Sequence, residues 1–109
     1  MKKILVFATV FGFAAVLNVR AAEAKATWYS QCAKCHGEDG KGQTKIGQKL
    51  GVKDFTDAKV QADLKDDAAA RTIKEGKKDQ DGKTLMKPFD TLSDDEVKAL
   101  VAYVRALKK

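Results

Sequence analysis

Apolar residues recur at helical spacing in four stretches of the chain, and no stretch shows a convincing strand pattern. The first stretch contains Ala24, Trp28 and Cys32, which are four residues apart and would share one helix face. The four predicted helices cover residues 24–36, 57–64, 67–75 and 93–107. The pattern therefore predicts an all-α fold of about four helices.

The last predicted helix has the clearest start signal. Ser93-Asp94-Asp95-Glu96 has the form of a capping box, in which the serine and glutamate side chains each accept a backbone N–H from the other residue. The apolar residues that follow are spaced as on one buried helix face: Val97, Leu100, Val101, Val104 and Leu107. We expect this face to form part of the core.

Two segments between the predicted helices are expected to be loops. Residues 37–54 contain five glycines and several lysines, the composition of a loop that bends closely around something while its outer side stays in water. Residues 77–83 are polar, whereas residues 85–89 hold an apolar cluster with a proline. Because such a cluster is unusual in a solvent-exposed loop, we predict that this segment returns to the core.

The N-terminus has the pattern of a secretory signal peptide. Lys2 and Lys3 precede an apolar or small stretch over residues 4–17, and small residues suitable for signal peptidase lie near Ala21 to Ala24. An uncleaved membrane anchor is the alternative, but these 14 residues make about 21 Å of helix, less than the ~30 Å hydrocarbon core. We therefore predict a signal peptide at 1–24, a mature domain at 25–109 and a periplasmic location.

The composition fits one globular domain. The chain has 109 residues, of which 33% are charged, and its formal net charge is +6. Removing residues 1–24 takes away three basic residues and one acidic residue, which leaves 18 basic against 14 acidic and a charge of +4. This mild excess does not indicate nucleic-acid binding. Because a domain of this size buries only about 60% of its unfolded surface, we expect a cofactor or metal to stabilise it.

The candidate chemistry is concentrated in Cys32-Ala33-Lys34-Cys35-His36, which contains both cysteines and the single histidine. On one helical turn these three side chains project from the same side. Two thiols at that spacing can each add to one vinyl group of a porphyrin, and the adjacent imidazole can reach the iron, which predicts c-type haem attachment. A thioredoxin-type dithiol, a zinc site and a structural disulfide are alternatives. The first needs a βαβ scaffold and the second a fourth ligand.

The chain resembles the small bacterial class I monohaem cytochromes c over nearly the whole predicted mature domain. The matching features are an aromatic-bearing helix that leads into Cys32-Ala33-Lys34-Cys35-His36-Gly37, then Gly40-Lys41-Gly42, Lys49-Leu50-Gly51 ahead of Asp54-Phe55, a helix ending at Gly76, a methionine loop, and Leu100-Val101-Ala102-Tyr103-Val104. The resemblance implies an all-α fold wrapped around one haem c that is covalently attached through Cys32 and Cys35. It also implies His36 as the proximal iron ligand and a methionine as the distal one.

Elimination also points to Met86 as the distal ligand. The chain has two methionines, of which Met1 leaves with the signal peptide, and it has no second histidine. Met86 lies 50 residues beyond His36, far enough for the chain to pass around a haem and approach its other face. A role as a flexible core gap-filler is the alternative for Met86.

The chain departs from the family pattern at two places. Lys87 stands between Met86 and Pro88, whereas the family methionine is often followed directly by proline. The chain also lacks the proline whose carbonyl orients the proximal histidine in many family members. Because a ligating histidine usually donates its other N–H, we expect a backbone carbonyl near Ile46 or Gly47 to accept it.

The remaining aromatic residues are predicted to pack around the cofactor. Trp28, Tyr29 and Tyr103 are expected in the core or the haem wall, and Phe55 and Phe89 are expected to keep water from the iron.

A one-electron carrier is the predicted function, and we do not expect an enzyme. Iron with His36 and Met86 on its two axial sides has no open site, so it can only change valence. The alternatives are a haem subunit of a larger oxidoreductase and an open-site haem enzyme or sensor. We expect a monomer, without a membrane span in the mature chain, that meets redox partner proteins. Six lysines would form a positive rim for an acidic partner, or simply a solvated surface: Lys34, Lys41, Lys45, Lys49, Lys83 and Lys87.

Overall fold

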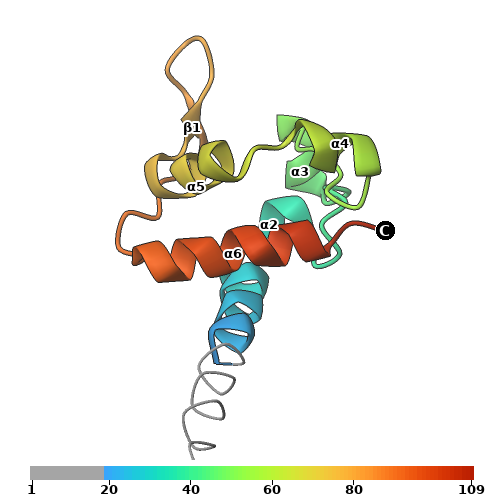
Figure 1. Cartoon of the computed structure of the whole chain (residues 1–109). Coiled ribbons are helices and arrows are strands. Elements are labelled where there is room, and N and C mark those ends of the chain that lie inside the picture. Colours follow the sequence, from blue (N-terminus) through green and yellow to red (C-terminus); the bar gives the residue numbers. More distant parts are fainter. Residues whose placement is uncertain (1–18) are drawn as a thin grey trace, which may run out of the picture.

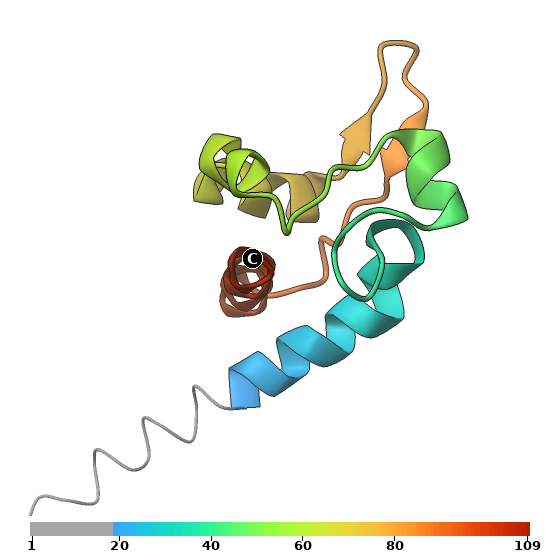
Figure 2. The same cartoon turned by 90° about the vertical axis from the view of Figure 1, so that its right-hand side faces the viewer.

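The computed structural model describes residues 19–109, so the apolar stretch of the predicted signal peptide lies outside the described residues. Residues 19–27 are α-helical and lead into the elements η1 (Trp28–Cys32), α2 (Ala33–His36), α3 (Lys45–Leu50), α4 (Ala58–Asp63), α5 (Asp66–Glu75), β1 (Lys77–Lys78), β2 (Thr84–Met86) and α6 (Asp94–Ala106). Figures 1 and 2 show the N-terminal helix crossing α6, with α4 and α5 on the other side of α6. The predicted all-α class is confirmed.

The N-terminal helix contains a π-helical turn that ends at the first cysteine, Cys32. The described part of this helix begins at residue 19, five residues before the predicted start at Ala24. Within η1 the backbone N–H of Ala33 bonds to the carbonyl of Trp28, five residues back, and α2 then continues to His36. Single π turns inside α-helices are frequent at functional sites because they shift side chains around the helix axis.

The segment predicted as one glycine-rich loop contains a helix, which corrects the prediction. α3 begins after Thr44, whose side chain accepts the N–H of Gly47, and it ends at Gly51 in the left-handed region (φ 71°). A side chain at Gly47 would collide with the carbonyl oxygen of Cys35. Glycine at this position therefore lets α3 pack directly against the backbone of the cysteine-containing turn.

The three later helices agree with the sequence pattern to within a residue or two. α4 is capped by the Asp57 side chain, and α5 ends at Gly76 with φ 77°. α6 has the predicted capping box: Glu96 accepts the N–H of Ser93 at 2.9 Å, and Ser93 accepts the N–H of Glu96 at 3.1 Å.

A short hairpin follows α5, although no strand was predicted. β1 pairs antiparallel with β2, with Lys77 opposite Met86, Lys78 opposite Thr84 and an irregularity between the two pairs. The Asp79 carboxylate accepts the N–H groups of Asp81 and Lys83 and so closes the connecting turn. Figure 1 shows this hairpin projecting beyond α5. Two- and three-residue strands leave no apolar alternation in the sequence, which is why the pattern did not reveal them.

The buried apolar core of the described residues lies where the N-terminal helix and α6 cross. Its members are Ala24, Trp28, Ala33, Val97, Leu100, Val101 and Val104. Trp28 is 2% exposed, as predicted for a core residue, whereas Tyr29 is 46% exposed. The core prediction for Tyr29 is therefore wrong, because this residue faces outward one position beyond the buried stripe. None of the ten residues of α5, all of which are described, is buried.

Candidate functional site

The two cysteines and the histidine lie where η1 passes into α2, so one short helical segment carries all three side chains. The helix ends immediately afterwards at Gly37 (φ 82°), and the following loop turns back over it. The carbonyl of Cys35 accepts the Thr44 hydroxyl at 2.8 Å, and the carbonyl of His36 accepts the N–H of Gly42 at 2.8 Å. These bonds satisfy carbonyls that a helix end leaves without intrahelical partners, and they fix the orientation of the turn.

The imidazole of His36 is held between aromatic rings. Its centroid lies 5.5 Å from that of Trp28 and 5.4 Å from that of Phe55, with interplanar angles of 33° and 28°. Trp28 is itself fixed, because its indole N–H donates to the carbonyl of Gly37 at 3.1 Å. Burial lowers the pKa of His36, so this environment favours the neutral imidazole, the form that binds a metal.

The predicted carbonyl partner of His36 is not found. The Nδ1 atom of His36 is buried and has no hydrogen-bond partner among residues 19–109. The carbonyl of Gly47 instead accepts the N–H groups of Val52 and Gly51. The Gly47 carbonyl thus closes the C-terminal end of α3, a helix that the sequence pattern did not predict.

Both cysteine thiols are free within the described part of the chain, and neither is fully buried. Burial, together with the nearby Cys35, raises the pKa of the Cys32 thiol to about 11. Catalytic dithiols instead have depressed thiol pKa values, because the thiolate is the nucleophile. The environment of Cys32 therefore does not resemble that of a thioredoxin-type active site.

The segment that carries Met86 is anchored to the C-terminal end of α5. Met86 is half-buried, and its backbone pairs with Lys77 in the hairpin. A side chain at Gly76 would collide with the Met86 carbonyl, and the N–H of Phe89 donates to the carbonyl of Ile73 at 2.9 Å. The segment thus lies against the end of α5, but none of residues 85–89 is buried, so its predicted return to the core is not confirmed. A bond from Met86 to iron stays a prediction.

These residues fit a covalently attached haem. Two free thiols and an imidazole on one turn supply the required attachment and ligand groups. Burial favours the neutral form of the His36 imidazole, the form that binds a metal, although its Nδ1 lacks the acceptor that a ligating histidine usually has. None of the apolar residues of α5 is buried, as expected for a helix that would pack against a large apolar ring.

The six lysines of the predicted positive rim lie at the surface. Lys41 is half-buried, and the other five side chains are exposed. On α3, between Lys45 and Lys49, the apolar side chain of Ile46 is also 37% exposed.

Three further residues matter for the arrangement of the site but were not identified from the sequence. Thr44 joins α3 to the Cys35 carbonyl, and its place one residue before a helix was a recognisable capping signal. Gln61 and Arg105 join α4 to α6 through side-chain bonds. Nothing in the hydrophobic pattern signals that a glutamine on a polar helix is buried.

No helix within residues 19–109 is long and apolar enough to cross a membrane.

Known proteins match most of the described chain. Residues 19–104 match the family model described as cytochrome c oxidase, cbb3-type, subunit III. The solved structure of the KustC0563 c-type cytochrome is 38% identical, has a TM-score of 0.68, and covers 79% of this chain and 98% of its own. A mutant of that protein gives 37% identity and a TM-score of 0.65, covering 78% and 98%. No curated protein sequence matches the chain. The match over residues 19–104 and the likeness to these structures place the chain in the family of small monohaem c-type cytochromes, with a class I cytochrome c fold that indicates a c-type haem electron carrier.

Proposed function

We propose that this protein carries single electrons between redox partner proteins outside the cytoplasm. Cys32 and Cys35 hold the haem covalently, and His36 and Met86 occupy the two axial positions of its iron. When bound, a c-type haem supplies one-electron chemistry at its iron.

The observation that carries this proposal is the state of the His36 ring. It packs against the rings of Trp28 and Phe55, and burial favours its neutral form by lowering its pKa. A neutral imidazole that is fixed by packing can bind a metal without first losing a proton or breaking a bond within the protein.

The Met86 segment supports the distal assignment. Its bonds to the end of α5 restrict where the thioether can lie, and a neutral sulfur ligand favours ferrous over ferric iron. Restricting an otherwise flexible methionine lowers the entropy lost when its sulfur binds.

Replacing Met86 with alanine tests the axial set. The ferric holoprotein should lose the weak red charge-transfer band of iron–methionine ligation, its reduction potential should fall, and it should bind cyanide faster because no ligand has to leave. Optical spectra and a spectroelectrochemical titration measure these changes. Lys87→Ala is the matched control, because this exposed neighbour should leave all three unchanged.

An unchanged spectrum and potential in Met86→Ala would show that Met86 only packs. If Lys87→Ala or Lys83→Ala removed the sixth ligand instead, a lysine of the same loop would be the distal group, and the His36/Met86 assignment would be wrong.

The exposed lysines favour an acidic redox partner. Charge complementarity accelerates association and is screened by salt. Electron transfer to an acidic acceptor should therefore slow as ionic strength rises, and lysine-to-glutamine changes at Lys45 and Lys49 should weaken that dependence. A rate that does not vary with salt would contradict this role.

A second candidate is a haem subunit of a membrane-bound oxidase, because the matching family model is described as an oxidase subunit. Fractionation of cells distinguishes the two. A free carrier is recovered in the extracytoplasmic soluble fraction at its own mass, whereas a subunit co-migrates with a larger haem complex from detergent-solubilised membranes.

A free carrier outside the cytoplasm requires removal of the N-terminal segment. Intact-mass measurement of the purified protein should give a chain beginning near Ala22 to Lys25 plus one haem. In the structure, the helix that leads into η1 continues across these possible cleavage sites. Arg20, which cleavage would remove, lies 3.7 Å from Asp95 of α6. A chain that keeps residues 1–20 and is found in membranes would instead be an anchored cytochrome.

A further inference from the structure

Gln61 is the one polar side chain that is buried among residues 19–109, at 5% exposed. Its amide nitrogen donates to two backbone carbonyls, that of Phe55 at 2.7 Å and that of Val104 at 2.8 Å. Its amide oxygen accepts a hydrogen bond from Arg105 at 3.1 Å. Burial of an amide is costly unless it is bonded in this way, so both ends of the Gln61 amide are used.

Arg105, near the end of α6, completes the arrangement. Its guanidinium donates to the carbonyl of Gln61 at 2.6 Å and to the carbonyl of Leu64 at 2.5 Å, and its Nε donates to Asp66 at 2.8 Å. From α6, the planar guanidinium thus bonds to α4, to the link that follows α4 and to the first residue of α5. It fixes how α4 and the start of α5 lie against α6.

Phe55 is where this network meets the candidate haem site. It belongs to no helix or strand, so no ladder of backbone bonds holds it. Its N–H donates to the carbonyl of Gly40 at 2.8 Å, and its carbonyl accepts the Gln61 amide. Its ring packs on His36 with a centroid separation of 5.4 Å. The bond from Gln61 therefore acts on the residue that covers one face of the imidazole.

We propose that Gln61 and Arg105 are positioning residues that hold Phe55 against His36, exclude water from that side of the imidazole and so raise the reduction potential. The inference rests on the proposed ligation of iron by His36. Water near the iron favours the more highly charged ferric form, so a Phe55 ring that is held in place favours the ferrous form.

The test uses the holoprotein with Gln61→Glu. A carboxylate keeps the shape and can still pair with Arg105, but it cannot donate to the carbonyls of Phe55 and Val104. We expect the equilibrium constant for reduction of the ferric form to fall about tenfold, which is about 59 mV for a one-electron couple. Nuclear Overhauser contacts between the Phe55 and His36 rings should weaken, while the absorption bands of the axial ligands are retained.

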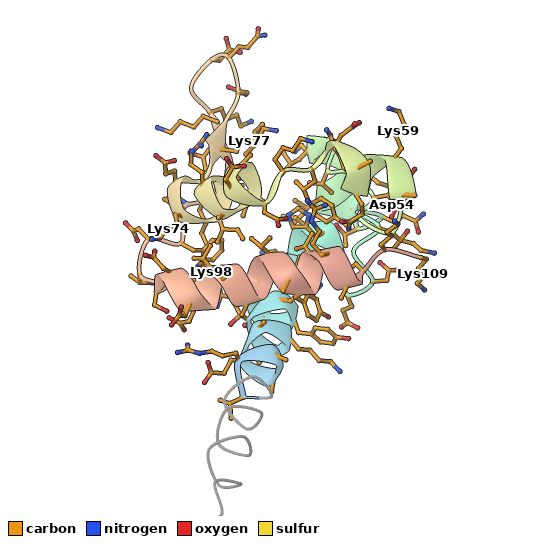
Figure 3. The ribbon with its side chains drawn as sticks, in the orientation of Figure 1. Asp54, Lys59, Lys74, Lys77, Lys98 and Lys109 are labelled. Atoms are coloured by element: carbon orange, nitrogen blue, oxygen red, sulfur yellow. The ribbon has the colours of Figure 1, made fainter. Side chains whose placement is uncertain are left out.

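A second variant and a control keep the test decisive if Gln61→Glu does not fold. Arg105→Lys keeps the positive charge but loses the planar set of donors, so it should shift the potential in the same direction. Lys59→Gln on the same short helix is the control, because the Lys59 side chain is 85% exposed and points outward (Figure 3). It should change neither the potential nor the ring contacts.

The route through Phe55 is tested by combining changes. In a Phe55→Leu background, Gln61→Glu should lower the potential by less than it does alone, because only the direct effect of the added carboxylate charge remains once the phenyl ring is gone. A lowered unfolding midpoint with unchanged potential and ring contacts would show that Gln61 and Arg105 only stabilise the fold and would overturn the inference. Additive shifts in the reduction potential of the double variant would also overturn the inference. If the proposed function itself were wrong, the unsubstituted protein would already lack the absorption bands of histidine–methionine ligation, which distinguishes that failure from the other two outcomes.

Discussion

The turn that carries His36 is fixed mainly through its backbone carbonyls. Thr44 donates to the carbonyl of Cys35, Gly42 to that of His36 and Trp28 to that of Gly37. Each donor comes from outside the turn. The local conformation of the site therefore depends on residues that take no part in ligand chemistry.

Thr44→Val tests this dependence. The substitution keeps the side-chain shape but leaves the Cys35 carbonyl without its donor and the Gly47 N–H without its acceptor. We expect the free energy of unfolding to fall by about 1–3 kcal/mol, the cost of half-buried polar groups left unpaired. Chemical denaturation of the holoprotein measures it. Thr91→Val, at an exposed threonine, should have little effect, and equal stability of Thr44→Val and the unsubstituted protein would contradict this role of Thr44.

Local spacing predicted that one helical segment carries both cysteines and the histidine, because residues within five positions need only one helical turn. Longer-range contacts were not accessible in this way. The sequence predicted an acceptor near Gly47 for the imidazole, but that carbonyl closes α3. It also predicted Tyr29 in the core or the haem wall, whereas Tyr29 is 46% exposed, because neighbouring aromatic residues do not reveal which one faces inward.

Among the elements, α6 has the best-defined start. Backbone and side-chain hydrogen bonds from Ser93 lower the pKa of Glu96 below its ordinary 4.5, and the hydrogen bond from Lys74 lowers that of Asp94. Figure 3 shows Lys74 near the beginning of this helix. Both carboxylates are more acidic in the folded state than in the unfolded state. Their contribution to stability is therefore present above the unfolded pKa and is lost as the pH falls through the folded pKa.

Glu96→Gln should remove part of that pH dependence. We expect the variant to be less stable than the unsubstituted protein at neutral pH, because a neutral side chain interacts less favourably with the helix N-terminus. The difference should shrink as the pH falls below about 4.5, where the glutamate of the unfolded chain is already protonated. Thermal unfolding midpoints from pH 7 to pH 3 measure this, and two parallel curves would contradict it.

Helices with apolar residues at helical spacing or a clear capping signal were predictable, whereas α3 and the short hairpin were not. The capping box and apolar repeat defined α6, whereas α3 has six residues with a glycine inside and has the composition of a loop. α3 forms because Thr44 and Gly51 satisfy its two ends and because Gly47 lets it approach Cys35. Such tertiary contacts override a weak local preference.

Across the whole molecule, the apolar core of the described residues is concentrated at one helix crossing. The N-terminal helix and α6 supply it, while α5 is held to α6 by ion pairs of Lys74 with Asp94 and of Arg105 with Asp66. Exposed ion pairs contribute little to stability. We therefore expect the half of the domain that contains α5 to depend on a bound group for its packing.

The double variant Cys32→Ser, Cys35→Ser tests this dependence. Without thioether attachment the chain should lose most of its haem, and the loss of a group that binds only the folded state should destabilise it. We expect lower helix content by circular dichroism, with hydrogen-exchange protection lost first in α4 and α5. An apoprotein with native helix content and protection in α5 would show that the chain packs by itself.

The proposed electron carrier requires a covalent haem whose iron is closed on both axial sides by His36 and Met86. The visible spectrum of the purified protein, recorded ferric and ferrous with and without carbon monoxide, is the decisive measurement. We expect low-spin spectra in both states, the weak red band of methionine ligation in the ferric state, and a ferrous spectrum that carbon monoxide leaves unchanged. High-spin ferric iron, or a ferrous spectrum that carbon monoxide shifts at once, would mean an open site and would contradict a simple electron carrier.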